Sequence, residues 1–120
     1  MKPFIQLMKA LSDPNRVGVL KMLEQGEICA CEIQAVLGLA QPTVSKHMKI
    51  LEEAGLVQRR RQGTWMLYSL AEEEKSVYVE VMLEHLAAWL NDDPDVERML
   101  AALPDAATMR TLTTKKDNKS

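Results

Sequence analysis

The pattern of apolar and polar positions predicts a series of short helices interrupted by one β-hairpin. Apolar residues recur at helical spacing from Pro3 to Leu11, which indicates a first helix. A Ser-Asp-Pro segment at residues 12–14 supplies a cap and a first-turn proline, so a second helix is expected to begin there. This helix carries the apolar positions of a core element and should end at Gly26.

The segment Ile28–Leu70 organises the rest of the chain. Apolar positions between residues 33 and 37 share a helical face, and Gly38 follows where a helix end favours a left-handed residue. Pro42 lies just inside the start of the next helix, whose apolar positions continue at helical spacing. Two β-prone runs then flank Gly63. This order predicts a mainly α fold with a small β-hairpin, a winged helix-turn-helix.

The second helix of this segment and the hairpin carry residues suited to DNA. Amides, hydroxyls and cations on the polar helix face can reach base edges and phosphates in a major groove. Three consecutive arginines near the hairpin tip can lie along the DNA backbone, or can instead form a solvated edge that protects the hairpin from aggregation. The DNA-binding candidates are Gln41, Thr43, Ser45, Lys46, His47, Lys49, Arg59, Arg60, Arg61 and Thr64.

A Cys-Ala-Cys box at residues 29–31 lies at the start of the segment Ile28–Leu70. Its pairing with the sequence Gln-Pro-Thr-Val-Ser-Lys-His at residues 41–47 resembles the ArsR/SmtB family of metal-responsive bacterial repressors, and within it the arsenic-responsive branch. The resemblance covers about residues 3–90. It implies a homodimeric repressor that a thiophilic ion releases from its operator.

The position of the two cysteines at a helix start indicates their chemistry. A Ser or Thr cap often precedes a Glu by three positions, and Cys29 precedes Glu32 by three, so Cys29 is expected at the cap and Cys31 at the second helical position. Since the helix dipole favours an anion there, we expect lowered thiol pKa values. Residues two apart in a regular helix point about 200° away from each other, so one ion should bind both sulfurs only if the first turn unwinds.

The inducer of such a repressor is expected to be arsenite or antimonite, As(III) or Sb(III), bound by Cys29 and Cys31 with no cofactor required. Some family members carry a third cysteine where this chain has Gln34, so the ion would keep an outside ligand. A second family metal site on the dimer helix is judged absent, because only Glu84 and His85 are nearby and they face different sides. The cysteines can instead be small apolar fillers, or a redox or persulfide sensor.

Composition and charge limit the possible architectures. The chain has 120 residues, of which 47% are hydrophobic, which suits one compact domain at residues 1–103 with a flexible tail at 104–120. Its net charge of −2 argues against binding DNA through overall positive charge. However, Gln41–Trp65 holds five Lys and Arg against two Glu, so DNA should be directed to one surface.

A long apolar helix is predicted at Glu72–Leu90. Between Val77 and Leu90, the acidic, basic and histidine residues are confined to Glu80, Glu84 and His85. A helix this apolar is usually covered on more than one side, here by the core and by a partner subunit. The sequence has no signal segment or membrane span, so the protein is expected in the cytoplasm, where free thiols are available as ligands.

Two other classes of function are compatible with parts of this pattern. A thiol-disulfide exchange enzyme would need a strand-helix-strand frame before the cysteines, and none is predicted, so we do not expect an enzyme. A protein-interaction winged-helix adaptor would not need the cationic helix face. The sequence therefore favours a DNA-binding transcriptional repressor.

Overall fold

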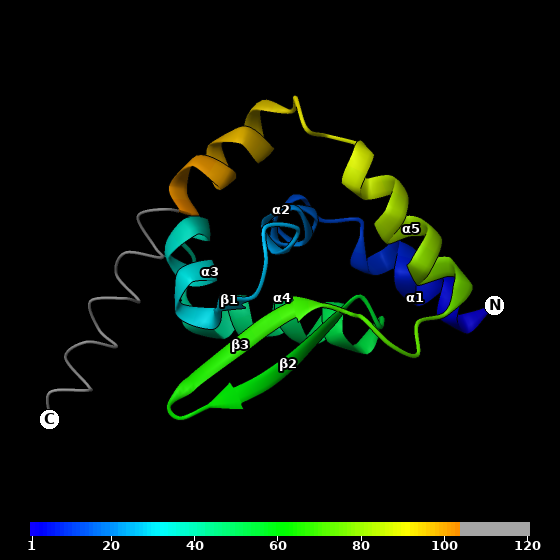
Figure 1. The fold of residues 1–120 in the computed structure, drawn as a ribbon, viewed down its shortest axis with the longest axis horizontal. Coiled ribbons are helices and arrows are strands. Elements are labelled where there is room, and N and C mark those ends of the chain that lie inside the picture. The colour runs from blue at the N-terminus through cyan, green and yellow to red at the C-terminus, as the bar shows by residue number, and fades with distance from the viewer. Residues whose placement is uncertain (104–120) are drawn as a thin grey trace, which may run out of the picture.

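The computed structural model describes residues 1–103, and α2 (Pro14–Leu23) lies at their centre (Figure 1). The carboxylate of Asp13 caps this helix by accepting the N–H groups of Asn15, at 2.8 Å, and Arg16, at 3.3 Å. Every residue from 18 to 23 is buried, as expected for a core helix. The predicted tail at 104–120 lies outside the described residues.

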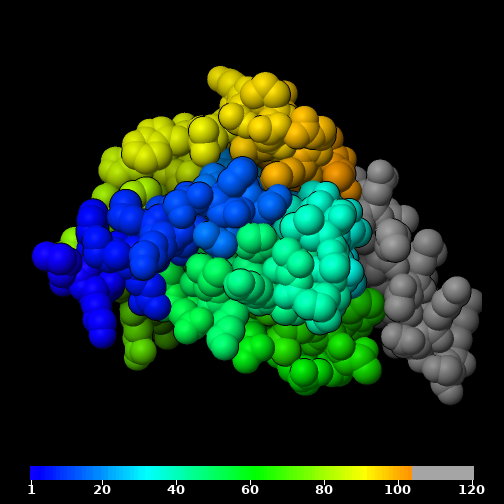
Figure 2. Space-filling model, turned by 180° about the vertical axis from the view of Figure 1, so that it is seen from behind, coloured from blue at the N-terminus to red at the C-terminus, as the bar shows by residue number. Residues whose placement is uncertain are grey.

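The other elements surround α2 as a winged helix-turn-helix, which confirms the predicted fold. At one end, α1 (Lys2–Ala10) and α5 (Val77–Ala88) lie side by side (Figure 1). A further helix, at residues 94–103, lies on the side of α3. Seen from behind, α3 and α4 lie next to each other below α2 (Figure 2). The segment Ile28–Leu70 consists of β1 (Ile28–Cys29), α3 (Ala30–Leu37), α4 (Gln41–Glu53), β2 (Val57–Gln62) and β3 (Trp65–Leu70).

The sheet has a third strand that the sequence did not reveal. β1 pairs with β3 in an antiparallel sheet of order β1-β3-β2, and Cys29 is opposite Leu67. Leu67 is in turn opposite Arg60 on β2. The first cysteine and the middle arginine of the wing, the hairpin formed by β2 and β3, therefore lie in one row across the sheet.

The helix predicted at Glu72–Leu90 is shorter than expected. It begins at Val77 because the hydroxyl of Ser76 accepts the N–H of Val79 at 3.1 Å and caps the helix there. The acidic residues 72–74 precede this cap, so they do not form the first helical turn. Of the predicted range, the apolar segment Val77–Ala88 is the part that forms the helix.

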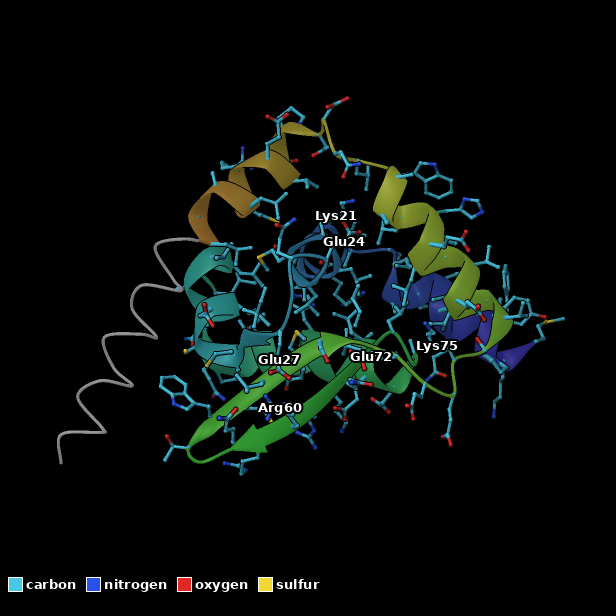
Figure 3. All side chains as sticks on the ribbon, viewed as in Figure 1. Lys21, Glu24, Glu27, Arg60, Glu72 and Lys75 are labelled. Atoms are coloured by element: carbon cyan, nitrogen blue, oxygen red, sulfur yellow. The ribbon has the colours of Figure 1, made fainter. Side chains whose placement is uncertain are left out.

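A buried lysine ties α2 to the end of α5. Lys21 is 1% exposed, and its ammonium donates to the carbonyls of Leu86 and Trp89, both at 2.8 Å (Figure 3). It also donates to Asn91 Oδ1 at 2.9 Å and pairs with Glu24 at 2.8 Å. Lys21 thereby binds two carbonyls at the end of α5, where the usual intrahelical donors run out. Within residues 1–103 no helix has both the length and the apolar character to cross a membrane.

Candidate thiol site and nucleic-acid interface

Cys29 occupies the N-cap of α3, as the sequence predicts. Its sulfur accepts the N–H of Cys31 at 3.3 Å, and the carboxylate of Glu32 accepts the N–H of Cys29 at 2.9 Å. The Cys29 sulfur also accepts the backbone N–H of Glu32, and the reciprocal bonds between Cys29 and Glu32 form a capping box in which a thiol replaces the usual hydroxyl. Cys29 is buried and Cys31 is exposed, so the second thiol is the one that solvent reaches first.

The two sulfurs already lie close together, and the expected need to unwind the helix is wrong. Cys29 Sγ and Cys31 Sγ are 2.7 Å apart. The 200° separation does not apply because Cys29 has extended backbone angles, φ −71° and ψ 144°, outside the helix. With metal–sulfur bonds of about 2.3 Å, two thiolates on one ion are roughly 3.3–3.8 Å apart. Rotation of the exposed Cys31 side chain can supply this small opening.

The expected lowering of the thiol pKa is wrong for Cys31. The pKa of Cys31 is raised to about 12, chiefly because the thiol is partly removed from water. Its hydrogen bond with Cys29 and the negative charges of Cys29 and Glu32 add to this rise. A backbone hydrogen bond at the helix start acts in the opposite direction but is weaker. At neutral pH the Cys31 thiol therefore holds its proton.

This raised pKa predicts how Cys31 reacts with iodoacetamide. Below the pKa, the thiolate fraction rises tenfold per pH unit, so the alkylation rate at Cys31 should keep rising from pH 7 to pH 10. Peptide mapping by mass spectrometry at each pH measures this rate. A rate that levels off near pH 7 would mean that the helix dipole dominates after all.

A cavity of about 280 Å³ joins the thiols to α4 and the β2–β3 hairpin. From the predicted site residues it brings together Cys29, Cys31, Gln41, Ser45 and Thr64, whereas the remaining DNA-binding candidates do not line it. Its other walls are Ala30, Gln34, Val44, Trp65 and Met66. The sequence did not associate Trp65 with the thiols, because only the pairing of β1 with β3 brings the wing next to the cysteine box.

The polar face of α4 is open to solvent. Gln41, Thr43, Ser45, Lys46 and Lys49 are all exposed. Gln41 donates to the hydroxyl of Ser45 at 3.1 Å, so these two side chains form one polar unit. This face can therefore approach another molecule without rearrangement of the core.

His47 differs from the other candidates on α4 because it is half-buried. Its Nδ1 lies 3.0 Å from the guanidinium of Arg16 on α2. Arg16 also donates to the carbonyl of Ala10 at the end of α1, at 2.8 Å. His47 therefore has a partner in the fold and helps to fix α4 against the first two helices.

The three arginines of the wing differ in their surroundings. Arg60 makes a bidentate ion pair with Glu27 at 2.8 and 2.6 Å, and this hydrogen bonding raises the pKa of its guanidinium (Figure 3). Arg59 pairs with Glu52 at 3.0 Å. Arg61 makes no ion pair with any residue in the described part of the chain. Its charge is therefore the one that is not offset locally.

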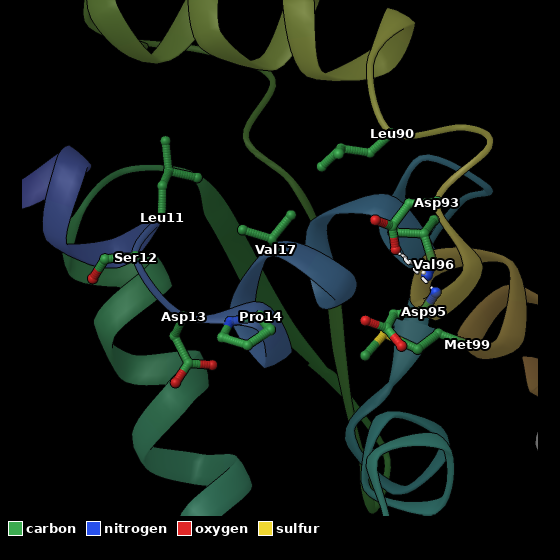
Figure 4. A pocket seen from close by; sticks show the side chains of 10 residues that line it. All are labelled: Leu11, Ser12, Asp13, Pro14, Val17, Leu90, Asp93, Asp95, Val96 and Met99. Carbon is green, nitrogen blue, oxygen red and sulfur yellow. Dashed lines mark hydrogen bonds between the residues drawn. The ribbon is translucent and has the colours of Figure 1, made fainter.

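A second cavity, of about 370 Å³, lies between the start of α2 and residues 90–99 (Figure 4). Asp13, Asp93 and Asp95 line it, but Asp13 caps α2, and Asp93 accepts the N–H groups of Asp95 and Val96. These carboxylates have structural tasks at helix starts. Within residues 1–103 there is no group of three or more His, Cys, Asp or Glu that could hold a metal ion.

Comparison with known proteins places these features in context. The sequence pattern of bacterial regulatory proteins of the arsR family matches residues 13–59. An uncharacterized HTH-type transcriptional regulator of Methanocaldococcus jannaschii is 38% identical over 80 residues, which cover 66% of this chain and 90% of the relative. The arsenical resistance operon repressor of Escherichia coli K12 is 43% identical over 68 residues, which cover 56% of this chain and 58% of that repressor.

A solved structure supports the same grouping. A homodimeric winged helix-turn-helix DNA-binding domain from Mycobacterium bovis, described as a possible ArsR-family transcriptional regulator, aligns with a TM-score of 0.62 at 29% identity. The alignment covers 72% of this chain and 77% of that one. The family match at residues 13–59 includes both cysteines and the whole of α4.

Proposed function

Because this chain belongs to the arsR family of bacterial regulatory proteins, which are DNA-binding transcriptional regulators and not enzymes, we propose that it is a repressor released by As(III) or Sb(III). The inducer would be held by Cys29 and Cys31. One observation carries this proposal: the two sulfurs, 2.7 Å apart, share a cavity with Gln41 and Ser45 of α4. A ligand at the thiols therefore lies next to residues that would read the operator.

The protonated state of Cys31 favours trivalent arsenic over a divalent metal ion. Arsenous acid, As(OH)₃, is neutral, and each thiol proton leaves with a hydroxyl group as water when an As–S bond forms. A divalent ion must instead expel the thiol protons into solvent, and the pKa of about 12 at Cys31 makes this costly at neutral pH. Soft thiolate ligands also suit a thiophilic ion.

The operator-binding surface would combine α4 and the wing. The exposed amides and hydroxyls of Gln41, Thr43 and Ser45 suit base edges in a major groove, and the ammonium groups of Lys46 and Lys49 suit phosphates. Thr64 and Arg61 extend this surface along the hairpin. His47 would act mainly by holding α4 against Arg16.

Arg61→Ala is expected to weaken binding to operator and to random DNA about equally, since a phosphate contact carries little sequence information. It should also lower the slope of log affinity against log salt by about 1. Arg60→Ala is the matched control, and its effect should be smaller because Glu27 already offsets that charge. Anisotropy titrations at several salt concentrations measure both. A larger slope change for Arg60→Ala would contradict this assignment.

We also propose that the repressor is a homodimer formed through α1 and α5. Both helices expose apolar side chains, and the rings of Phe4 and Tyr78 meet edge to face, with centroids 5.6 Å apart. The two helices therefore share one apolar surface, which suits an interface between subunits. The similar Mycobacterium bovis domain is homodimeric. The large apolar residues that α1 and α5 expose are Phe4, Ile5, Val77, Tyr78 and Val81.

Val81→Glu is expected to raise the dimer dissociation constant at least about tenfold, because a carboxylate would be buried at the interface. Val81 is 44% exposed in the single chain, so the substitution should spare the core. Glu80→Gln, on the same helix, is the control and should remain dimeric. Sedimentation at micromolar concentration measures both, and a dimeric Val81→Glu variant would argue against this interface.

A redox function remains the second candidate, because sulfurs 2.7 Å apart are also well placed for oxidation. Hydrogen peroxide would take two electrons and two protons from the thiols, giving a disulfide and two water molecules. Titration of the operator complex with arsenite, peroxide and zinc in parallel separates the two functions. Release by arsenite at the lowest concentration supports the proposal, and release by peroxide but not by arsenite selects the redox sensor.

A further inference from the structure

We propose that Glu27 competes with DNA for Arg60 of the wing and thereby restrains the affinity of this protein for DNA. This inference rests on the proposed function, because it concerns the regulation of the same DNA-binding surface. The bidentate ion pair between Glu27 and Arg60, at 2.8 and 2.6 Å, is the observation that carries it (Figure 3).

The carboxylate of Glu27 occupies the position that a DNA phosphate would take. The guanidinium of Arg60 donates through Nε and Nη2 to the two carboxylate oxygens. This planar fork binds carboxylates and phosphates with the same paired geometry. A phosphate that binds through the same two nitrogens must therefore displace Glu27.

The side chain of Arg60 lies on a different face of the wing from the two arginines beside it. Alternate residues of a strand share a face. Gln58 and Arg60 line a cavity of about 670 Å³ together with Glu27, which belongs to the loop between α2 and β1. Arg59 and Arg61 do not line this cavity. Arg60 is therefore held toward that loop rather than toward a molecule beyond the wing.

The ion pair is accessible to competing anions. The side chain of Arg60 is 56% exposed and that of Glu27 is 31% exposed. An ion pair this open to water is weak, so a phosphate of the operator is able to displace the carboxylate. Glu27 therefore lowers the affinity for DNA without preventing binding.

The shape of the wing does not depend on this ion pair. β2 pairs with β3 along its whole length, from Val57 opposite Leu70 to Gln62 opposite Trp65. If the ion pair served mainly to hold the wing in place, loss of Glu27 would loosen the wing and lower the affinity for DNA. Competition predicts the opposite sign, because loss of Glu27 frees a cation that already lies on a formed hairpin.

The test is the affinity of the full-length Glu27→Gln variant for operator and for random DNA, measured without arsenite. Both affinities should rise about threefold to tenfold at low salt. The slope of log affinity against log salt should become steeper by about as much as Arg61→Ala reduces it. Glu72→Gln is the matched control, because Glu72 lines the same cavity but makes no ion pair within residues 1–103. It should change either affinity by less than about twofold, since salt screens a distant surface charge.

Two further variants show whether the gain passes through Arg60. Glu27→Gln combined with Arg60→Ala should bind both DNAs as Arg60→Ala alone does. Arg60→Lys keeps the charge but lacks the fork, so Glu27 should hold it less tightly and random DNA should bind about twofold more tightly or better. This variant also tests the proposal if Glu27→Gln does not fold.

The possible outcomes separate this inference from the proposed function. A gain that persists without Arg60, or an equal gain in Glu72→Gln, would show an effect of overall charge and would overturn the competition. Reduced affinity of a folded Glu27→Gln variant would assign the ion pair to holding the wing instead. Failure of the wild type to bind either DNA at low salt would overturn the proposed function itself.

Discussion

Cys29→Ser and Cys31→Ser are each expected to bind the operator as the wild type does and to remain bound when arsenite is added. A serine hydroxyl is nearly the size of a thiol and is a good helix cap, so the capping box at the start of α3 should survive. A hydroxyl does not replace a thiolate toward a soft ion. The variants should therefore be locked in the DNA-bound state.

The size of this effect follows from linkage. A hundredfold loss of DNA affinity on induction corresponds to about 2.7 kcal/mol of preference of the inducer for the DNA-free protein. Each serine variant should lose nearly all of this preference. At the arsenite concentration that releases the wild type, the DNA affinity of the variant should therefore change by less than about twofold. Ala35→Ser, on the exposed side of α3, is the control and should respond normally. Normal release from either cysteine variant would exclude a two-thiol switch.

Lys21→Met is expected to lower the free energy of unfolding by about 3 kcal/mol, which is the scale for removing one partner of a buried ion pair. The substitution keeps most of the side-chain volume. It leaves the carbonyls of Leu86 and Trp89 and the carboxylate of Glu24 without their shared donor. Since these carbonyls end α5, that helix should also become less well fixed at its C-terminus.

Urea denaturation followed by circular dichroism measures this loss of stability. Lys9→Met, on the exposed face of α1, is the matched control, and it should change the free energy of unfolding by less than about 0.5 kcal/mol. If Lys21→Met were as stable as the control, the four contacts of the ammonium would do no more than offset the free-energy cost of removing it from water. Lys21 would then be a tolerated buried charge rather than a tie between α2 and α5.

The sequence predicted the features that depend on near neighbours in the chain. The cap at Asp13, the capping box of Cys29 and Glu32, and the helix end at Gly38, with φ 66°, each follow from residues within four positions of one another. Such local rules fix where helices begin and end, so the order of the elements was predictable.

The features that depend on pairing across the fold were not predictable in the same way. The two-residue strand β1 is too short to show a periodic pattern, although it brings Trp65 and Met66 to the thiols. The short distance between the sulfurs results from the extended backbone of Cys29, which a helical template does not represent. Lys21 was missed because a lysine is normally expected at the surface.

The same limit applies to the charges of the wing. Three adjacent arginines look equivalent in the sequence, yet Glu27 and Glu52 offset Arg60 and Arg59 in the fold. Residue 27 precedes β1 and residue 60 lies on β2. They come within reach of each other because β1 and β2 both pair with β3 in the sheet. The assignment of a phosphate contact to Arg61 therefore needed the structure.

The most direct test of the central claim is arsenic X-ray absorption spectroscopy of the protein loaded with one equivalent of arsenite, with operator release followed in the same samples. The account predicts two sulfur neighbours and one oxygen neighbour per arsenic in the wild type, and loss of DNA binding in proportion to this species. Three sulfur neighbours would require a thiol from a second chain. Release of DNA by an arsenic atom with one sulfur neighbour or none would contradict the two-thiol switch.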